Sequence, residues 1–170
     1  INHNSFRLIE DETFSPIKFL FHPIFVSLNY LEQEFNFDSY HMIGLSGGGW
    51  TTVVYSAIDE RGSKSFPVAG TFPISLRTEP QNFGDYEQTL PDLYRTVNYL
   101  ELYIMGSYGE GRSQLQIFNK YDPCCFSGNN YVYYEEIIKN KIAELNHGKF
   151  SIFSDDTHRE HQISENSLKQ

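Results

Sequence analysis

One stretch decides how the rest of the sequence is interpreted: residues 40–50 read YHMIGLSGGGW. Its first six residues are short and mostly apolar, which predicts a buried parallel strand. Residues 50–58 place Val53, Val54 and other apolar side chains on one face, which predicts a helix, with Gly62 as its C-terminal residue. Only a serine and three glycines stand between the two segments. The stretch therefore predicts a strand, a tight turn and a helix.

The same alternation continues along the chain. Strands are predicted at residues 66–72, 115–118 and 150–153, and helices at residues 16–35, 90–108 and 132–145. Strands that alternate with helices predict an α/β fold of three layers, in which helices cover both faces of a mainly parallel sheet. The long gap between the second and third strands predicts a helical insertion or lid at about residues 78–112, and an ordinary crossover helix is the alternative.

Length and charge limit the organisation and the partners of the protein. A chain of 170 residues predicts a single domain, residues 1–170, and a polar C-terminal tail from residue 158 onwards. The net charge of -9 argues against nucleic acid and anionic membrane surfaces as partners. The apolar runs are too short for a membrane span. A small-molecule substrate remains the expected partner.

The cysteines and the N-terminus say little about localisation. Cys124 and Cys125 are the only cysteines, and adjacent cysteines rarely form a disulfide. Free thiols favour the cytoplasm, although two cysteines are too few to decide the compartment. The chain begins at Ile1 without a signal-peptide pattern, which suggests that an N-terminal segment is missing.

The turn between the first strand and its helix has the pattern of a catalytic serine. Gly44-Leu45-Ser46-Gly47-Gly48 is a G-x-S-x-G sequence at a strand-to-helix junction, where the serine is held in a strained conformation and its hydroxyl is exposed. The backbone N–H of Gly47 would then lie at a helix N-terminus and donate to an oxyanion. A phosphate-binding loop is the alternative, but the lysine of that motif is absent. A packing turn is the other alternative. Ser46 is therefore the candidate nucleophile.

A serine nucleophile needs a base and an orienting carboxylate. Asp122 follows the third predicted strand, and His161 follows the fourth. The carboxyl ends of parallel strands meet at one edge of a sheet, so these side chains are expected near Ser46. We take Asp122 as the acid, with Asp85 or Glu79 as alternatives. We take His161 as the base, with His158, which lies among charged residues and is interpreted as solvent-exposed, as its alternative.

Two other readings of these residues carry less weight. Asp155, Asp156, His158 and His161 are of metal-ligand type, but no matching ligands occur elsewhere, so no metal site is predicted. Nothing near the two cysteines would activate a thiol, so they are interpreted as buried packing. No cofactor is predicted.

The sequence resembles the α/β-hydrolase superfamily in three places: the Ser46 turn, Tyr121-Asp122-Pro123 and the His161 loop. The resemblance extends over about residues 15–165. It implies hydrolysis of an ester or related acyl bond, with Ser46 as nucleophile, His161 as general base and Asp122 as orienting carboxylate. It leaves the substrate open.

The chain departs from the superfamily before the Ser46 turn. Members normally have several strands there, whereas only 43 residues precede Gly44 and they predict one helix. We therefore expect that N-terminal strands are missing and that a partner chain or a missing N-terminal segment completes the sheet. The alternative functions are a catalytically inactive hydrolase-like module that binds or scaffolds and a nucleotide-binding domain.

Overall fold

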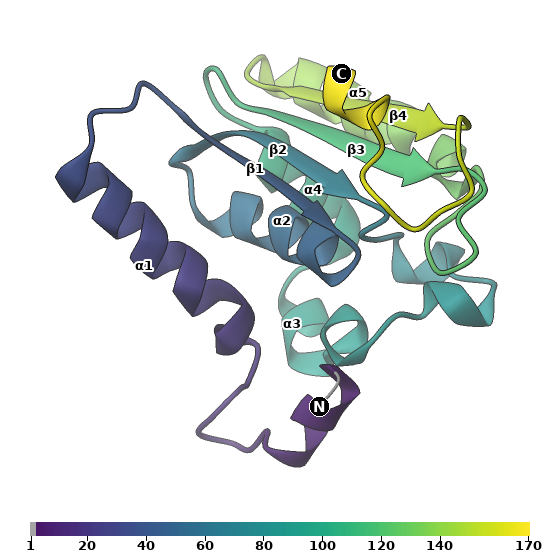
Figure 1. The fold of residues 1–170 in the computed structure, drawn as a ribbon, viewed down its shortest axis with the longest axis horizontal. Coiled ribbons are helices and arrows are strands. Elements are labelled where there is room, and N and C mark those ends of the chain that lie inside the picture. The colour runs from purple at the N-terminus through teal and green to yellow at the C-terminus, as the bar shows by residue number, and fades with distance from the viewer. Residues whose placement is uncertain (1–2) are drawn as a thin grey trace.

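Four parallel strands form the centre of the computed structural model, which describes residues 3–170 (Figure 1). The strands are β1 (Tyr40–Leu45), β2 (Gly62–Val68), β3 (Ser113–Asn119) and β4 (Lys149–Asp155). They lie in the order β1-β2-β3-β4, so each strand pairs with its neighbour in the sequence. The predicted α/β fold with a parallel sheet is confirmed. All four carboxyl ends therefore meet at one edge of the sheet, and the segments that leave this edge carry the predicted site residues.

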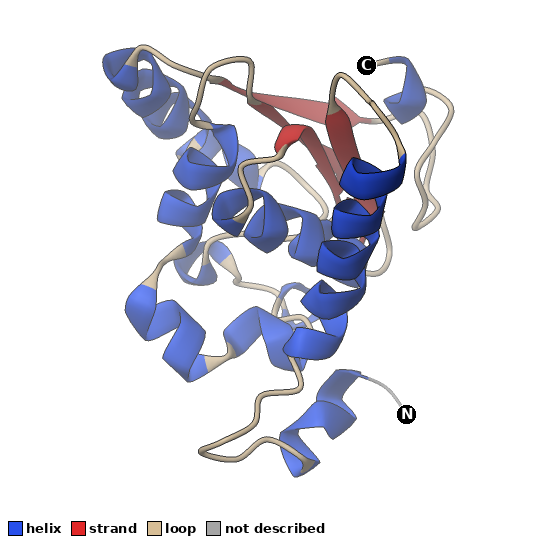
Figure 2. Ribbon diagram, turned by 90° about the vertical axis from the view of Figure 1, so that its left-hand side faces the viewer, coloured by secondary structure: helices blue, strands red, loops and turns tan. Residues whose placement is uncertain are grey.

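The α-helices of the structure are α1 (Lys18–Glu34), α2 (Gly47–Ile58), α3 (Pro91–Thr96), α4 (Tyr99–Ser107) and α5 (Glu135–Leu145). Short 3₁₀ turns join them: η1 (His3–Leu8), η2 (Ile74–Leu76), η3 (Pro80–Asn82), η4 (Tyr86–Thr89), η5 (Asn130–Tyr133) and η6 (Ser167–Lys169). Helices α2, α4 and α5 lie between the strands in sequence and pack against the sheet, whereas α1 precedes β1 and packs against α2 (Figure 2). Helix α4 packs against α2, α5 and β3, so it serves as the crossover between β2 and β3. Whether residues 78–112 also act as a lid stays a prediction.

Helix α2 is the most deeply buried element. Nine of its twelve residues are buried, among them Trp50 and Val53, which are fully inaccessible. The indole N–H of Trp50 donates to the hydroxyl of Tyr94 at 2.7 Å, and Phe21 of α1 stacks on the indole. The surrounding elements thus hold α2 in place, and they also fix the turn that precedes it.

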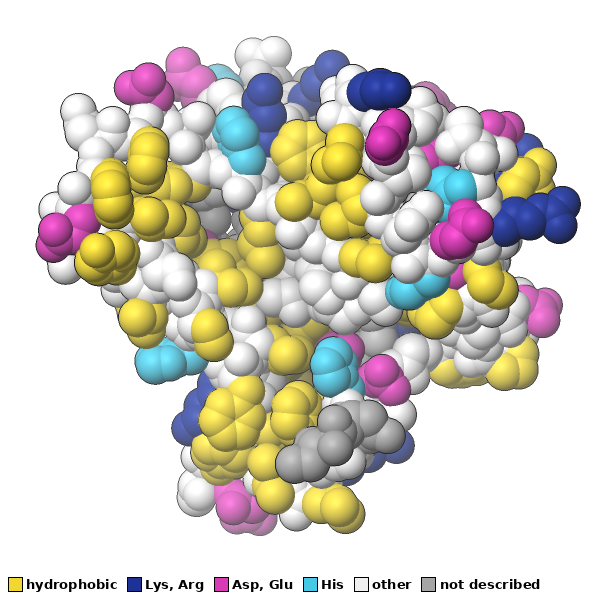
Figure 3. Space-filling view, in the orientation of Figure 1, with side chains coloured by type: hydrophobic (Ala, Val, Ile, Leu, Met, Phe, Trp, Pro, Cys, Tyr) yellow, Lys and Arg dark blue, Asp and Glu magenta, His cyan; other side chains and the backbone are white. Residues whose placement is uncertain are grey.

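Helix α1 differs from α2 in burial. It has no buried residue, and Phe25, Val26 and Tyr30 are about half exposed. Figure 3 shows hydrophobic side chains gathered over this helix and near the β1 side of the sheet. On β1, Ile43 is also exposed at 45%. The described residues therefore leave a broad apolar surface along α1 and the edge strand.

Several predicted boundaries were wrong. The helix expected at residues 90–108 is divided into α3 and α4, because Asn98 forms a capping box with Glu101 and starts a new helix. Gly62 begins β2 rather than ending a helix, and β2 ends at Val68 rather than at residue 72. After Val68, the backbone leaves the strand because Ala69 has a φ of 44°.

The C-terminal residues are also structured, contrary to the tail that the sequence predicted. Ser164 and Ser167 are buried and bind the carboxylate of Asp155. These polar side chains are buried because one acidic residue accepts their hydrogen bonds. Among the described residues, no helix has both the length and the hydrophobicity to cross a lipid bilayer.

Candidate active site

Ser46 occupies a sharp turn between β1 and α2. Its φ of 59° and ψ of -120° lie outside the regions that a serine normally adopts. Its backbone N–H donates to the carbonyl of Val68 at 2.9 Å, and its carbonyl accepts from the N–H of Trp50 at 2.9 Å. A strained conformation of this kind persists only where the surroundings impose it. Here the end of β2 and the first turn of α2 do so.

Close backbone contacts make this turn depend on glycine. A side chain on Gly44 would place its Cβ 2.2 Å from the carbonyl oxygen of Gly48. A Cβ on Gly49 would lie 2.8 Å from the Cα of Gly70. The strand and the helix can therefore approach only because these positions lack a Cβ. Gly48, by contrast, has open space around its Cβ position.

Asp122 and His161 form a hydrogen-bonded pair at the same edge of the sheet. The Nδ1 of His161 lies 2.6 Å from Oδ2 of Asp122, whose side chain is fully buried. The other carboxylate oxygen accepts the backbone N–H of Cys124 at 2.8 Å. Since an ionised carboxylate only accepts hydrogen bonds, the proton of this pair lies on Nδ1. The ring is thereby oriented, and Nε2 remains for another partner.

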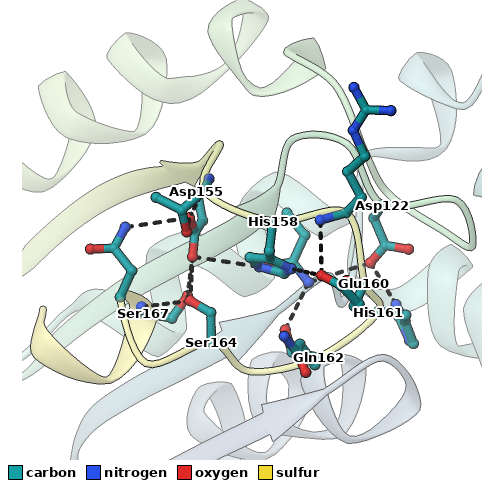
Figure 4. A network of polar contacts seen from close by, with 12 residues as sticks. Asp122, Asp155, His158, Glu160, His161, Gln162, Ser164 and Ser167 are labelled. Atoms are coloured by element: carbon teal, nitrogen blue, oxygen red, sulfur yellow. Dashed lines mark hydrogen bonds and ion pairs between the residues drawn. The ribbon is translucent and has the colours of Figure 1, made fainter.

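A buried polar network holds the His161 loop (Figure 4). The amide of Asn119 donates to the carbonyl of Gln162 at 2.8 Å, which ties the loop to the end of β3. At the end of β4, Asp155 accepts hydrogen bonds from the side chains of Thr157, Ser164 and Ser167. Burial acts to raise the pKa of Asp155, but the hydrogen bonds from Ser164 and Thr157 outweigh it, and the pKa is lowered.

His158 belongs to this network and not to the Asp122 pair. Its side chain is only 9% exposed, so the prediction of a solvent-exposed histidine was wrong. Its Nε2 lies 3.5 Å from Asp155, and neither ring nitrogen has a hydrogen-bond partner among the described residues. Of the two candidate histidines, the structure thus places His161 against Asp122 and His158 against Asp155.

The alternative acids lie elsewhere. Glu79 is exposed, and Asp85 is exposed and accepts a hydrogen bond from the side chain of Asn4 at 2.6 Å. Neither forms a hydrogen bond or an ion pair with His161 among residues 3–170. Within the same residues, no hydrogen bond joins Ser46 to His161. The structure therefore brings Asp122 and His161 together after β3 and β4 and places Ser46 after β1, at the same sheet edge, with β2 between β1 and β3.

Cys124 and Cys125 are joined in a disulfide, so the expectation of free thiols was wrong. Neighbouring cysteines can bond because the turn after Asp122 brings the two sulfurs together. In the part of the chain that the structure describes, two groups of side chains have metal-ligand atoms within 4.8 Å of one another: the two cysteines with His161, and His3 with Asp85 and Glu87. The sulfurs of the first group are bonded to each other.

Several solved structures have a similar fold, although no family model and no curated protein matches this sequence. Est1E from Butyrivibrio proteoclasticus with ferulic acid bound has a TM-score of 0.55 at 13% identity, and the match covers 88% of this chain and 63% of Est1E. A second Est1E structure gives a TM-score of 0.52 at 12% identity, with 81% and 59% covered. The acylaminoacyl peptidase of Pyrococcus horikoshii gives 0.54 at 12% identity, with 84% and 23% covered.

The chain has an α/β-hydrolase-like fold. It spans about three fifths of the length of Est1E and about a quarter of the peptidase. At 12–13% identity the likeness shows the fold alone, so the site has to be argued from its own residues.

Sequence patterns assign no supporting role to Asn119, and they mark Asp155 only as a residue of metal-ligand type. Asn119 and Asp155 each end a strand, at the edge where such sheets place their sites, and that position was the available signal. His3 and Glu87 are a different case. They are 84 residues apart and meet only in the folded chain, so no local pattern predicts their contact.

Proposed function

We propose that this chain carries the nucleophile, acid and base of a serine hydrolase that cleaves an ester or related acyl bond. The observation that supports it best is the strained Ser46 turn at the same sheet edge as the Asp122–His161 pair. A nucleophile elbow of this kind exposes the serine hydroxyl above the sheet. The hydrolase-like fold favours a hydrolase activity but does not identify the substrate.

In the proposed mechanism, Nε2 of His161 takes the proton of Ser46 as the hydroxyl attacks the acyl carbon. Asp122 holds the ring in the required tautomer and stabilises the imidazolium that forms. The backbone N–H of Gly47, one of the first helical N–H groups without an intrahelical partner, donates to the oxyanion. His161 then returns the proton to the leaving group. Water hydrolyses the acyl-enzyme by the same steps.

The edge of the sheet forms part of the proposal. Strand β1 has a neighbour on one side only among the described residues, and Ile43 and the apolar side chains of α1 are exposed beside it. An unpaired apolar edge favours pairing with further polypeptide. We expect a partner chain or a preceding segment to complete the sheet there and to supply a second oxyanion donor.

Covalent labelling with a fluorophosphonate probe tests the proposed function. We expect labelling of the chain and complete loss of labelling in Ser46→Ala, because the probe reacts only with an activated serine. Circular dichroism and urea unfolding of both proteins control for folding. If neither the folded chain nor a folded version extended at the N-terminus labels, the catalytically inactive binding module becomes the better interpretation.

A further inference from the structure

A second histidine–carboxylate pair lies beside the Ser46 turn. The Nδ1 of His3 is 2.8 Å from Oε1 of Glu87, which joins η1 to η4. The same two turns are also connected by an edge contact between the rings of Phe6 and Tyr86. The His3 ring is therefore held in place by packing as well as by its hydrogen bond. Since the carboxylate accepts, Nδ1 carries the proton and Nε2 is left for another group.

The His3–Glu87 pair lies close to Ser46, the proposed nucleophile. A Cβ built on Gly47 would lie 2.7 Å from Cε1 of His3 and 3.4 Å from Oε1 of Glu87. Gly47 follows Ser46 directly, and neighbouring Cα atoms are about 3.8 Å apart. A small substrate held on Ser46 would therefore lie within reach of the His3 ring.

One oxygen of the Glu87 carboxylate has no hydrogen bond within residues 3–170, which is unusual for a buried ion pair with a purely structural role. Glu87 is 1% exposed, and its Oε2 has no hydrogen-bond partner among the described residues. A buried carboxylate oxygen without a donor is destabilising. In the Asp122 pair, by contrast, both carboxylate oxygens accept hydrogen bonds. The side chain of His3 is 39% exposed, so its ring is open to a ligand.

Resting on the function proposed above, we propose that His3 and Glu87 form a recognition subsite for a hydroxyl group next to the scissile acyl bond. His3 contacts the substrate through Nε2, and Glu87 is the positioning residue that orients the ring. A hydroxyl can both donate and accept, so it suits Nε2 whether or not that nitrogen carries a proton. Because the His3 side chain is 39% exposed, water would take the place of a missing hydroxyl, so the expected preference is that of one exchanged hydrogen bond.

Matched substrates test the subsite. On the acyl side, 4-nitrophenyl 3-hydroxybutyrate is compared with 4-nitrophenyl butyrate; on the alcohol side, glycerol monobutyrate is compared with propyl butyrate. We expect kcat/KM to favour the hydroxylated member of at least one pair by roughly five- to tenfold, the effect of one neutral hydrogen bond. The pair that shows the preference identifies the side of the ester that the subsite contacts.

The variants separate this subsite from the catalytic residues. His3→Phe keeps the ring that stacks on Phe6 and removes Nε2, so the preference should fall to about one. Glu87→Gln removes the charge that orients the ring and should reduce the preference in part. The control Glu79→Gln changes an exposed carboxylate of the same connection and should keep the preference of the unmodified chain.

Each result has one meaning. If labelling depends on Ser46 but neither substrate pair shows a preference, or if His3→Phe retains the preference, the subsite is wrong and the hydrolase function stands. If neither the folded chain nor a folded version extended at the N-terminus labels or hydrolyses any of the four esters, the function is wrong and the subsite fails with it. Glu87→Gln provides a second test should His3→Phe not fold.

Discussion

The His3–Glu87 pair beside the Ser46 turn and the Asp122–His161 pair at the same edge of the sheet differ in how completely their carboxylates are hydrogen-bonded. The Asp122–His161 pair has a fully buried carboxylate with both oxygens bonded, and its loop is fixed through Asn119. The Glu87–His3 pair leaves one buried oxygen without a partner and a more exposed ring. The carboxylate of Asp122 is fully hydrogen-bonded, whereas the exposed ring of His3 can contact a ligand through Nε2. The comparison therefore separates the proposed proton relay from the proposed recognition subsite.

The largest effect is expected from Asp122→Asn. Asparagine can still accept from the N–H of Cys124, but it no longer holds the His161 ring in the tautomer that accepts a proton from Ser46. We expect the rate of ester hydrolysis to fall by about 10³- to 10⁴-fold. Steady-state kinetics measure the loss, and circular dichroism shows whether the fold is kept. A loss smaller than tenfold in a folded variant would mean that this pair is not the relay.

Asp155→Asn tests the hydrogen-bond network that holds the His161 loop, for which the His3–Glu87 pair has no counterpart among the described residues. Asp155 is completely buried and accepts several hydrogen bonds, so its neutralisation should lower the free energy of unfolding by about 2 kcal/mol at pH 7. Urea unfolding measures this difference. The exposed neighbour Asp156→Asn is the matched control, with an expected change within about 0.5 kcal/mol.

The loss of stability caused by Asp155→Asn should depend on pH. The pKa of Asp155 is lowered from the ordinary value of 3.8 in the folded protein, so its contribution to stability is fully present well above that value. The contribution is lost as the pH falls through the lowered pKa. The stability difference between the unmodified chain and Asp155→Asn should therefore stay constant from pH 7 to about pH 5 and shrink as the pH falls below 3.8. A difference that grows toward acidic pH would contradict the hydrogen-bonding account.

The smallest effect is expected from alanine in the Ser46 turn, where two neighbouring glycines can be compared. A Cβ at Gly47 meets His3 and Glu87, whereas a Cβ at Gly48 meets nothing within 4 Å. We expect Gly47→Ala to displace His3 and to lower kcat/KM for the hydroxylated ester by roughly tenfold, since the hydrogen bond is lost. Gly48→Ala should raise stability by up to about 1 kcal/mol, as alanine does within a helix. If Gly47→Ala and Gly48→Ala lowered kcat/KM equally, the loss could not be assigned to His3, and the distinction between the two histidine–carboxylate pairs would be wrong.

Much of the candidate site could be predicted from the sequence because its residues lie at the ends of strands. The Ser46 turn follows a short apolar run, and Asp122 and His161 follow later runs, so a parallel sheet assigns all three to one edge. The sequence favoured His161 over His158 from their neighbouring residues alone. The actual choice depends on whether a ring faces Asp122 or Asp155, and the path of a loop between them determines that.

The sequence by itself determined the periodic elements, the α/β class and the strand–turn–helix around Ser46, because these depend on local spacing and on small residues at the turn. Only the tertiary structure decided the contacts that join distant segments. His3 meets Glu87, and the C-terminal serines bind Asp155, because packing of the turns against the sheet brings them together. The disulfide between Cys124 and Cys125 likewise depends on the turn after Asp122. Local periodicity carries no information about such pairings, since their energy arises only once the core has formed.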